Sequence, residues 1–403
     1  MEKKFRPLLF AGDINVVSVA RAFHEEYGII SSVYGKYPTG PCMNSKIMDY
    51  HAVSTADEQD TFIKLVEDFA EKHKDETILL IGCGDSYVEL ASANKDNLPE
   101  NVIAPYIDID MMHELIHKEK FYAMCEEAGV DYPDTFVHKK EMGKDFDLPF
   151  GPPYIIKPSN GIEYWRHPYP TQEKVYKAVT FDRLIEILTD IYMSGYDDSV
   201  IIQNFIPGDD TYMRVLTNYS DKNGKVKMMC LGHVLLEEHT PHGVGNHAVI
   251  ITERNEELEE KFKRLLESMN YIGFSNFDIK YDRRDGKYKV FEINTRQGRS
   301  NYYVTGSGAN VASYYVNDYI YNKEMEFFPA DKENLWLVVP KKVAFEYIKP
   351  EEYRQRMQKL FDEGKYVNPL INPADNGFMR RLRIWKNIHR HYKNFAIYMP
   401  KTD

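Results

Sequence analysis

Two carboxylates and an amide late in the chain have the spacing of a metal site. The segment GFSNFDIKYDRRDGKYKVFEINTRQG predicts a β-hairpin with Asp285 and Gly286 at its tip. A three-residue loop over 284–286, with the glycine in the left-handed position of a bulge, places Asp278 opposite Glu292. Asn294 then lies diagonally on the same face, because side chains alternate along a strand. Oxygen ligands of this kind favour Mg²⁺, which fills its other positions with nucleotide phosphates.

Two arginines follow this strand directly. Arg296 and Arg299 flank a glycine in TRQGR, and paired guanidinium groups bind phosphoryl or carboxylate groups bidentately. A hairpin with solvated acids would explain Asp278 and Glu292 but would leave Asn294 and this turn unexplained. The sequence therefore predicts a metal site next to an anion site.

A lysine interrupts an apolar strand in PYIIKPSNGIEYW. An unpaired Lys157 there would be costly to desolvate, so the residue requires an anionic partner, either a structural acid or a bound phosphate. Ser159, Asn160 and Gly161 follow as a polar loop whose backbone N–H groups could close over phosphates. This loop does not have the Walker A pattern.

A second strand ends beside two acids in SVIIQNFIPGDDTYMRVL. Backbone groups at the end of such a strand, between apolar walls, can bind a flat purine, and an acid after the turn can hold ribose hydroxyls. An ordinary strand and turn would give the same pattern. Lys118 lies on the first turn of a helix that Gly129 ends as a C-cap; alone, it reads as a solvated side chain.

The N-terminal part alternates strands and helices. RPLLFAGD followed by NVVSVARAFHEEYG, and ETILLIGCGDSYVELAS after the helix DEQDTFIKLVEDFAEKHK, predict a Rossmann-like parallel sheet. Neither turn has the GxGxxG pattern. Ligands bind beyond the carboxyl ends of parallel strands, so Gly12, Asp13, Gly84 and Asp85 either face a substrate or only form tight turns.

Composition indicates a globular protein with several packed units. The chain has 403 residues, 43% of them hydrophobic. It has no long apolar run and no cleavable leader pattern, which predicts a cytoplasmic protein. The formal charge of −11 argues against general nucleic-acid binding. Its 4 cysteines lack a metal-ligand spacing, which predicts reduced, buried thiols.

The order of these motifs resembles that of the ATP-grasp carboxylate–amine ligases, over roughly residues 105–310. Within that superfamily, IPGDDTYMRVL, MMCLGHVLLEEHTP and FEINTRQGRSNYYVT are similar to stretches of the bacterial D-aspartate ligases. The resemblance implies an α/β ATP-grasp fold with an N-terminal Rossmann-like domain. It also implies four parts: an N-terminal domain at 1–120, a central domain with the phosphate loop at 121–200, a domain with the Mg²⁺ site at 201–330, and a basic extension at 331–403.

The resemblance also assigns roles to residues. It implies that the nucleotide is bound by Lys118, Lys157, Ser159, Gly161, Gln203, Phe205, Ile206 and Asp210, the metal by Asp278, Glu292 and Asn294, and the substrates by Asp13, Arg214, Arg296 and Arg299, with Arg296, Arg299 and Lys157 acting in catalysis. Related enzymes commonly have Glu at the positions of Gln203 and Asp210, and their phosphate loops carry fewer bulky residues than the one that contains Trp165.

The implied activity is amide formation through an acyl phosphate, with ATP and Mg²⁺ and with Mn²⁺ as a substitute. The substrates implied are the β-carboxyl of D-aspartate and a lysine ε-amino group of a peptidoglycan precursor, without nucleic acid. The alternatives are a ligase for another carboxylate, an ATP-grasp kinase, and a nucleotide-binding regulator without chemistry. His233, His239, His242 and His247 also make a zinc site conceivable, but a substrate loop explains them as well.

The C-terminal stretch FMRRLRIWKNIHRHYKNFAIYMPK predicts a basic, aromatic helix. Such a helix could lie on an anionic membrane surface, cover the core, or bind the phosphates of a precursor. The apolar and aromatic stretches elsewhere in the chain could serve a dimer or only the core.

Overall fold

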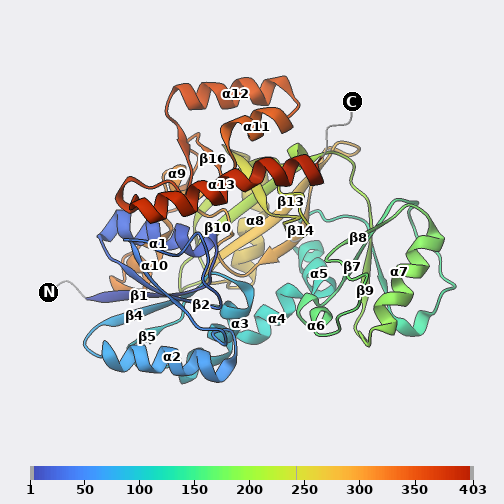
Figure 1. The fold of residues 1–403 in the computed structure, drawn as a ribbon. Coiled ribbons are helices and arrows are strands. Elements are labelled where there is room, and N and C mark those ends of the chain that lie inside the picture. The colour runs from blue at the N-terminus through green and yellow to red at the C-terminus, as the bar shows by residue number, and fades with distance from the viewer. Residues whose placement is uncertain (1–3, 242, 400–403) are drawn as a thin grey trace. The chain divides into compact units, whose positions relative to one another are not determined.

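The computed structural model describes residues 4–241 and 243–399 (Figure 1). The chain forms two compact units, and neither is continuous in sequence. Unit 1 contains residues 1–109, 210–276 and 294–403, and unit 2 contains residues 110–209 and 277–293. Each unit contains segments from several of the four parts expected from the sequence. The four-part division stays a prediction.

Unit 1 begins with a five-stranded parallel sheet in the order β3-β2-β1-β4-β5. Its strands are β1 (Phe5–Phe10), β2 (Ser31–Gly35), β3 (Met48–Ala52), β4 (Thr77–Gly82) and β5 (Val102–Ile103), and its helices are α1 (Ile14–Tyr27), α2 (Gln59–Lys72) and α3 (Asp85–Asn94). The predicted Rossmann-like arrangement is confirmed. Asp13 caps α1 by accepting a hydrogen bond from the Asn15 N–H, and Gly28 ends this helix with φ 65°.

The second sheet of the chain has eight strands, in the order β14-β13-β10-β11-β12-β16-β17, with β15 beside β11. Its strands are β10 (Met213–Ser220), β11 (Val226–Glu237), β12 (His247–Glu253), β13 (Gly273–Asp282), β14 (Lys287–Asn294), β15 (Phe328–Pro329), β16 (Leu335–Leu337) and β17 (Tyr366–Val367). Strands β10, β11 and β12 are antiparallel neighbours, and β16 pairs antiparallel with β12.

The remaining helices of unit 1 follow or separate these strands. They are α8 (Glu256–Ser268), α9 (Tyr302–Gly306), α10 (Val311–Tyr315), α11 (Lys341–Tyr347), α12 (Glu351–Asp362) and α13 (Phe378–Tyr398), with a π-helical turn at Val316–Ile320 and 3-10 turns at Lys95–Asn97, Asp210–Tyr212 and Pro373–Asp375. The basic C-terminal stretch is therefore helical, as predicted.

Unit 2 is built on a four-stranded sheet in the order β6-β9-β7-β8. Its elements are α4 (Ile109–Ile116), α5 (Lys118–Ala128), β6 (Thr135–His138), a 3-10 turn (Lys140–Met142), β7 (Tyr154–Pro158), α6 (Gly161–Trp165), β8 (Tyr176–Ala178), α7 (Phe181–Met193) and β9 (Val200–Asn204). Strand β7 pairs antiparallel with both β8 and β9. The segment 277–293, with most of β13 and β14, also belongs to this unit.

All four cysteines are buried free thiols, as predicted. No helix among the described residues is long and apolar enough to cross a membrane.

Candidate active site

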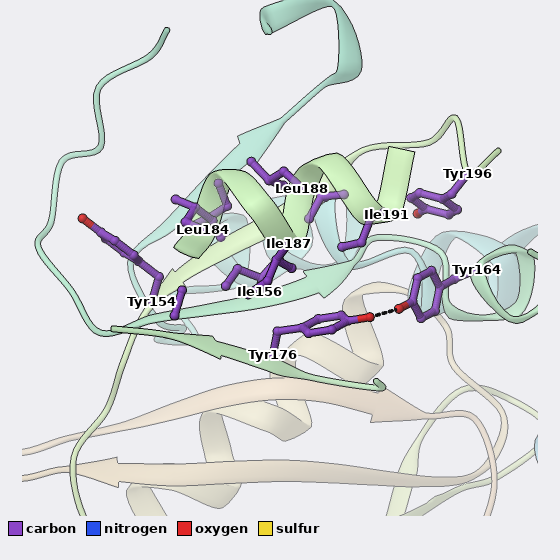
Figure 2. Close-up of a cluster of buried hydrophobic side chains, with 12 residues drawn as sticks. Tyr154, Ile156, Tyr164, Tyr176, Leu184, Ile187, Leu188, Ile191 and Tyr196 are labelled. Atoms are coloured by element: carbon purple, nitrogen blue, oxygen red, sulfur yellow. Dashed lines mark hydrogen bonds between the residues drawn. The ribbon is translucent and has the colours of Figure 1, made fainter. Parts of the chain in front are cut away.

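The sheet of unit 2 has one apolar face and one polar face. Tyr154 and Ile156 of β7 and Val200 and Ile202 of β9 join α7 in a buried cluster (Figure 2). Because side chains alternate along a strand, Lys157 and Gln203 point to the opposite face. The apolar packing against α7 therefore fixes which face of the sheet carries the polar residues.

Lys157 is buried among charged groups on that face. It is 8% exposed, and its Nζ lies 4.5 Å from the centre of the Phe291 ring. Burial lowers the pKa of Lys157 to about 8, and the positive charges of Lys118 and Lys174 act in the same direction, while the nearby Glu292 carboxylate raises it.

Lys118 belongs to the same cluster, and its pKa shifts in the same direction. Burial also lowers the pKa of Lys118, and Glu292 again opposes the shift. Asp278 acts on Lys157 too, and Lys174 lies 3.8 Å from Glu292. The structure therefore brings the predicted phosphate lysines together with two of the predicted metal ligands. Cations whose pKa is lowered in this way favour a polyanionic ligand, because its negative charge would stabilise their protonated form.

Gln203, which was predicted to bind adenine, lies near the end of β9. Its Nε2 donates to the Tyr122 hydroxyl and to Thr135 Oγ1, each at 3.0 Å. Among the described residues, its buried Oε1 has no hydrogen-bond partner. A buried acceptor of this kind is costly unless a ligand donor reaches it, and the amino group of adenine is such a donor.

The residues after Gln203 also have definite environments. The Phe205 N–H donates to the Pro153 carbonyl at 3.3 Å, and Lys177 Nζ lies 4.1 Å from the centre of the Phe205 ring. Ile206 is buried. This end of β9 therefore provides apolar walls, as expected for a purine site.

The segment after Lys157, predicted to be a phosphate loop, has hydrogen bonds within the fold. The Ser159 N–H donates to the Ser199 carbonyl at 3.0 Å, and the Asn160 N–H donates to the Tyr196 hydroxyl at 3.1 Å. The Asn160 side chain then caps the short helix α6, which begins at Gly161. The first two N–H groups are therefore used within the fold, and the phosphate-binding role of Ser159 and Gly161 stays a prediction.

The turn between β13 and β14 covers residues 283–286 and is one residue longer than predicted. Gly286 has φ 74°, in the left-handed region as predicted. The difference arises because Asp282 ends β13 by accepting from the Arg284 N–H at 3.0 Å. Asp282 also forms ion pairs with the Arg284 guanidinium and with Lys289, at 2.7 and 3.0 Å. The pairing of Asp278 with Glu292 stays a prediction.

In unit 1, the residues after β14 form a cluster of arginines and acids. Arg296 Nε lies 2.6 Å from Asp85 Oδ1, and Arg299 Nη2 lies 3.0 Å from Glu238 Oε1. Burial raises the pKa of Asp13, and the charges of Arg299 and Arg296 oppose that shift. The structure thus joins two predicted substrate arginines to the predicted acid after β1.

Neutral polar side chains hold this turn to the carboxyl ends of β1 and β4. Asn15 Nδ2 donates to the carbonyls of Cys83 and Gln297, at 2.8 and 3.3 Å. Asn301 Nδ2 donates to Asn15 Oδ1 at 2.8 Å. Asn15, Gln297 and Asn301 are all buried. A side chain at Gly298 would lie 2.5 Å from Asn276 Oδ1, so the glycine between the arginines permits this close approach.

Other predicted residues have hydrogen bonds or ion pairs of their own. Arg214 is buried in an ion pair with Glu253 and donates to two backbone carbonyls. Asp210 Oδ2 accepts from the Glu237 N–H and from His239 Nε2, each at 2.9 Å. Asn294 Nδ2 donates to the Asn276 carbonyl at 3.4 Å. The roles of Arg214, Asp210 and Asn294 in ligand binding stay predictions.

The histidines of the conceivable zinc site have separate hydrogen bonds. His233 Nε2 lies 2.7 Å from the Thr211 carbonyl, and His247 Nδ1 lies 3.3 Å from Ser300 Oγ. His242 falls outside the described residues. Within the described ranges, no group of three or more His, Cys, Asp or Glu side chains could hold a metal ion.

Comparison with known proteins gives one relative over nearly the full chain. It is a D-aspartate ligase of Enterococcus faecium (strain Aus0004), 38% identical over 408 residues that cover 98% of this chain and 97% of the relative. The chain belongs to the D-aspartate ligase family. As a member of this family, it is an ATP-dependent carboxylate–amine ligase. No family model matches the chain.

Solved structures confirm the ATP-grasp fold of this D-aspartate ligase family member. An N5-carboxyaminoimidazole ribonucleotide synthetase in its ADP complex matches with a TM-score of 0.60 at 11% identity, covering 98% of each chain. The biotin carboxylase domain of the 2-oxoglutarate carboxylase from Hydrogenobacter thermophilus, solved with MgADP and bicarbonate, also matches with a TM-score of 0.60. The identity there is 15%, over 83% of this chain and 73% of that chain.

Sequence reasoning missed several residues of the ligase that shape these clusters. Lys174 lies beside Glu292, and Glu238 pairs with Arg299. Lys174 has no local motif, and Glu238 lies in MMCLGHVLLEEHTP without a pattern that singles it out, so their long-range contacts reveal them. The buried asparagines Asn15 and Asn301 each follow a predicted site residue closely in sequence, and that adjacency was the one available signal.

Proposed function

We propose that this ligase joins the β-carboxyl group of D-aspartate to the ε-amino group of a lysine in a peptidoglycan stem-peptide precursor, with release of ADP and phosphate. The observation that carries the proposal is the 38% identity to a D-aspartate ligase along almost the whole chain. Because ATP and such precursors are made in the cytoplasm, we also propose that the enzyme acts there.

Unit 2 supplies groups suited to the nucleotide. Lys118 and Lys157 would hold the phosphates, and Gln203 Oε1 would accept from the adenine amino group. The lowered pKa values of the two lysines and the unsatisfied Gln203 oxygen support these roles. Binding and orientation supply most of the catalysis in phosphoryl transfer.

The oxygen ligands Asp278, Glu292 and Asn294 fit a hard divalent cation. We propose that they bind Mg²⁺, with Mn²⁺ as a substitute that has the same preference for oxygen. When bound, the cation would neutralise phosphate charge during phosphoryl transfer to the carboxylate. The MgADP bound to the related biotin carboxylase domain supports this assignment.

Unit 1 supplies groups suited to an amino acid. Arg296 and Arg299 would bind its carboxylate groups, and the partly buried Asp13 would accept from its ammonium group. A substrate with charges of both signs matches a cluster in which arginines and acids already neutralise one another. Arg214, whose guanidinium is paired with Glu253, is a further candidate for substrate binding.

The test is phosphate release by the purified enzyme with ATP, Mg²⁺ and a lysine-containing stem peptide, with D- and L-amino acids supplied one at a time. We expect release with D-aspartate, together with a product whose mass is that of the amide. The matched control is Glu292→Gln, which keeps the size of the side chain and should not release phosphate. Phosphate release with a different amino acid would identify that amino acid, and not D-aspartate, as the substrate. A phosphorylated product without amide would indicate a kinase instead.

A further inference from the structure

Helix α13 is fixed in unit 1 by one of its faces. Arg380, Ile384, His391 and Phe395 are buried, and Arg380 Nε lies 3.0 Å from Asp375 Oδ2 in a fully buried ion pair. The Phe395 ring lies 5.1 Å from the ring of Tyr347 in α11. One face of the helix therefore covers the core. Because these contacts fix the orientation of the helix, they also fix which side chains lie on its opposite face.

The opposite face carries a row of exposed apolar and aromatic side chains. The row contains Phe378, Leu382, Trp385, His389 and Tyr392, which recur every three or four residues and so share one side of the helix. Phe378 is 80% exposed and Trp385 is 54% exposed. The Trp385 and His389 rings stack at 4.3 Å. Large aromatic side chains held in water in this way are typical of an interaction surface.

A parallel row of cations lies beside the aromatic row. Lys386, Arg390 and Lys393 recur at the same helical spacing and are exposed, as is Arg381. The helix contains no aspartate or glutamate, although the whole chain has a formal charge of −11. The exposed face of α13 is thus basic and amphipathic on an otherwise acidic protein.

The positive charges of α13 distinguish between the partners that could bind its exposed face. A second copy of α13 would place cations against cations, with no acid on either helix to compensate. An anionic partner gains from the same charges. Leu382 and Phe378 add purely apolar area that phosphates alone would not bury, whereas the boundary between lipid headgroups and acyl chains accepts both rows at once.

We propose that the exposed face of α13 docks on the surface of an anionic lipid bilayer. The helix lies flat, with its aromatic row at the headgroup boundary and its cations at the lipid phosphates. None of the residues of this surface belongs to the nucleotide or the amino-acid cluster, so the inference does not depend on the substrate of the ligase.

The test is co-sedimentation of the full-length protein with vesicles of phosphatidylglycerol and phosphatidylcholine, and with vesicles of phosphatidylcholine alone. We expect binding to the anionic vesicles only, and weaker binding as salt increases. The triple variant K386E/R390E/K393E should bind at least ~100-fold more weakly, at about fivefold for each lost positive charge.

A matched control changes three exposed lysines near α2. K64E/K72E/K74E alters net charge by the same amount on another exposed surface of unit 1 and should bind as the unmodified protein does. A second variant, L382S/W385S, removes apolar contacts without changing charge and should also reduce binding. Thermal unfolding would verify that each variant is folded.

Three results would overturn the proposal. The first is equal binding to neutral and anionic vesicles, or binding to neither. The second is a concentration-dependent dimer in sedimentation equilibrium that K386E/R390E/K393E abolishes, which would identify a second copy as the occupant. The third is loss of a nucleic-acid complex in that variant without any lipid binding.

Discussion

Replacing Lys157 by methionine should make the protein more stable and the enzyme much less active. Methionine has a similar length and volume and carries no charge. The site of Lys157 disfavours its charged form, since the pKa is lowered from 10.5 to about 8, mainly by burial. If this cation acts in catalysis, its charge therefore lowers the free energy of unfolding.

The size of that cost follows from the shift. A change from 10.5 to about 8 corresponds to about 3 kcal/mol, at about 1.4 kcal/mol for each pH unit. Below pH 8 the lysine is charged in both the folded and the unfolded chain, so the full cost applies. Between these two pKa values the unfolded chain holds a proton that the folded chain has lost, so the free energy of unfolding rises with pH.

Urea unfolding at two pH values tests this reasoning. We expect Lys157→Met to raise the free energy of unfolding by up to ~3 kcal/mol at pH 7 and by about 2 kcal/mol at pH 9. The control is Lys177→Met, on the neighbouring strand β8, whose lysine is exposed and should give no gain. A variant that is less stable than the unmodified protein at pH 7, or a gain that does not shrink at pH 9, would refute the account.

The same substitution should remove the nucleotide interaction. A lysine about 4 Å from a phosphate charge contributes up to about 4 kcal/mol in a partly buried site. We therefore expect kcat/KM for ATP to fall by roughly 10²- to 10³-fold. Lys157→Arg should retain part of this activity and should lose the pH dependence near 8, because a guanidinium stays charged there. Unchanged kinetics in both variants would remove Lys157 from the nucleotide site.

Other substitutions separate binding from folding. Arg299→Gln should lower kcat/KM for the amino acid by roughly 10²-fold while the KM for ATP is unchanged, as steady-state kinetics would show. Asp375→Asn should reduce stability by about 3–5 kcal/mol in urea unfolding, because it leaves the Arg380 cation buried without its acid. Asp282→Asn should destabilise the protein at pH 7, and the loss should shrink as pH falls below 3.8, since ion pairs hold the Asp282 pKa far below that ordinary value. Removal of Mg²⁺ by EDTA should stop phosphate release, and added Mg²⁺ should restore it in the unmodified enzyme but not in Glu292→Ala.

Local sequence signals were sufficient for the strands and helices that carry the site. Gly129 ends α5 in the left-handed conformation, at φ 69°, as its position predicted, and Gly28 ends α1 in the same way, at φ 65°. The apolar run around Lys157 forms β7. Such signals depend only on neighbours in sequence, so they can be interpreted without knowledge of the tertiary fold.

Long-range contacts were not predictable in the same way. Asp282 ends β13 early because it pairs with Arg284 and Lys289, and a turn pattern alone does not weigh these charges. The pattern around Ser159 predicted a loop with N–H groups available to phosphates, but the Ser159 N–H is bonded to the Ser199 carbonyl. The two compact units are also discontinuous in sequence, and composition carries no mark of where residues 277–293 join unit 2.

The two arginines after β14 differ in how readily a substrate can replace their partners. The side chain of Asp85 is 63% exposed, whereas that of Glu238 is 9% exposed. An exposed ion pair contributes little, typically below about 1 kcal/mol, so a substrate carboxylate can displace Asp85 from Arg296 at small cost. Displacing Glu238 from Arg299 would leave a buried carboxylate without its cation. Arg296 is therefore suited to exchange its partner for a substrate carboxylate, whereas Arg299 is suited to bind a substrate carboxylate while it keeps Glu238 as its partner.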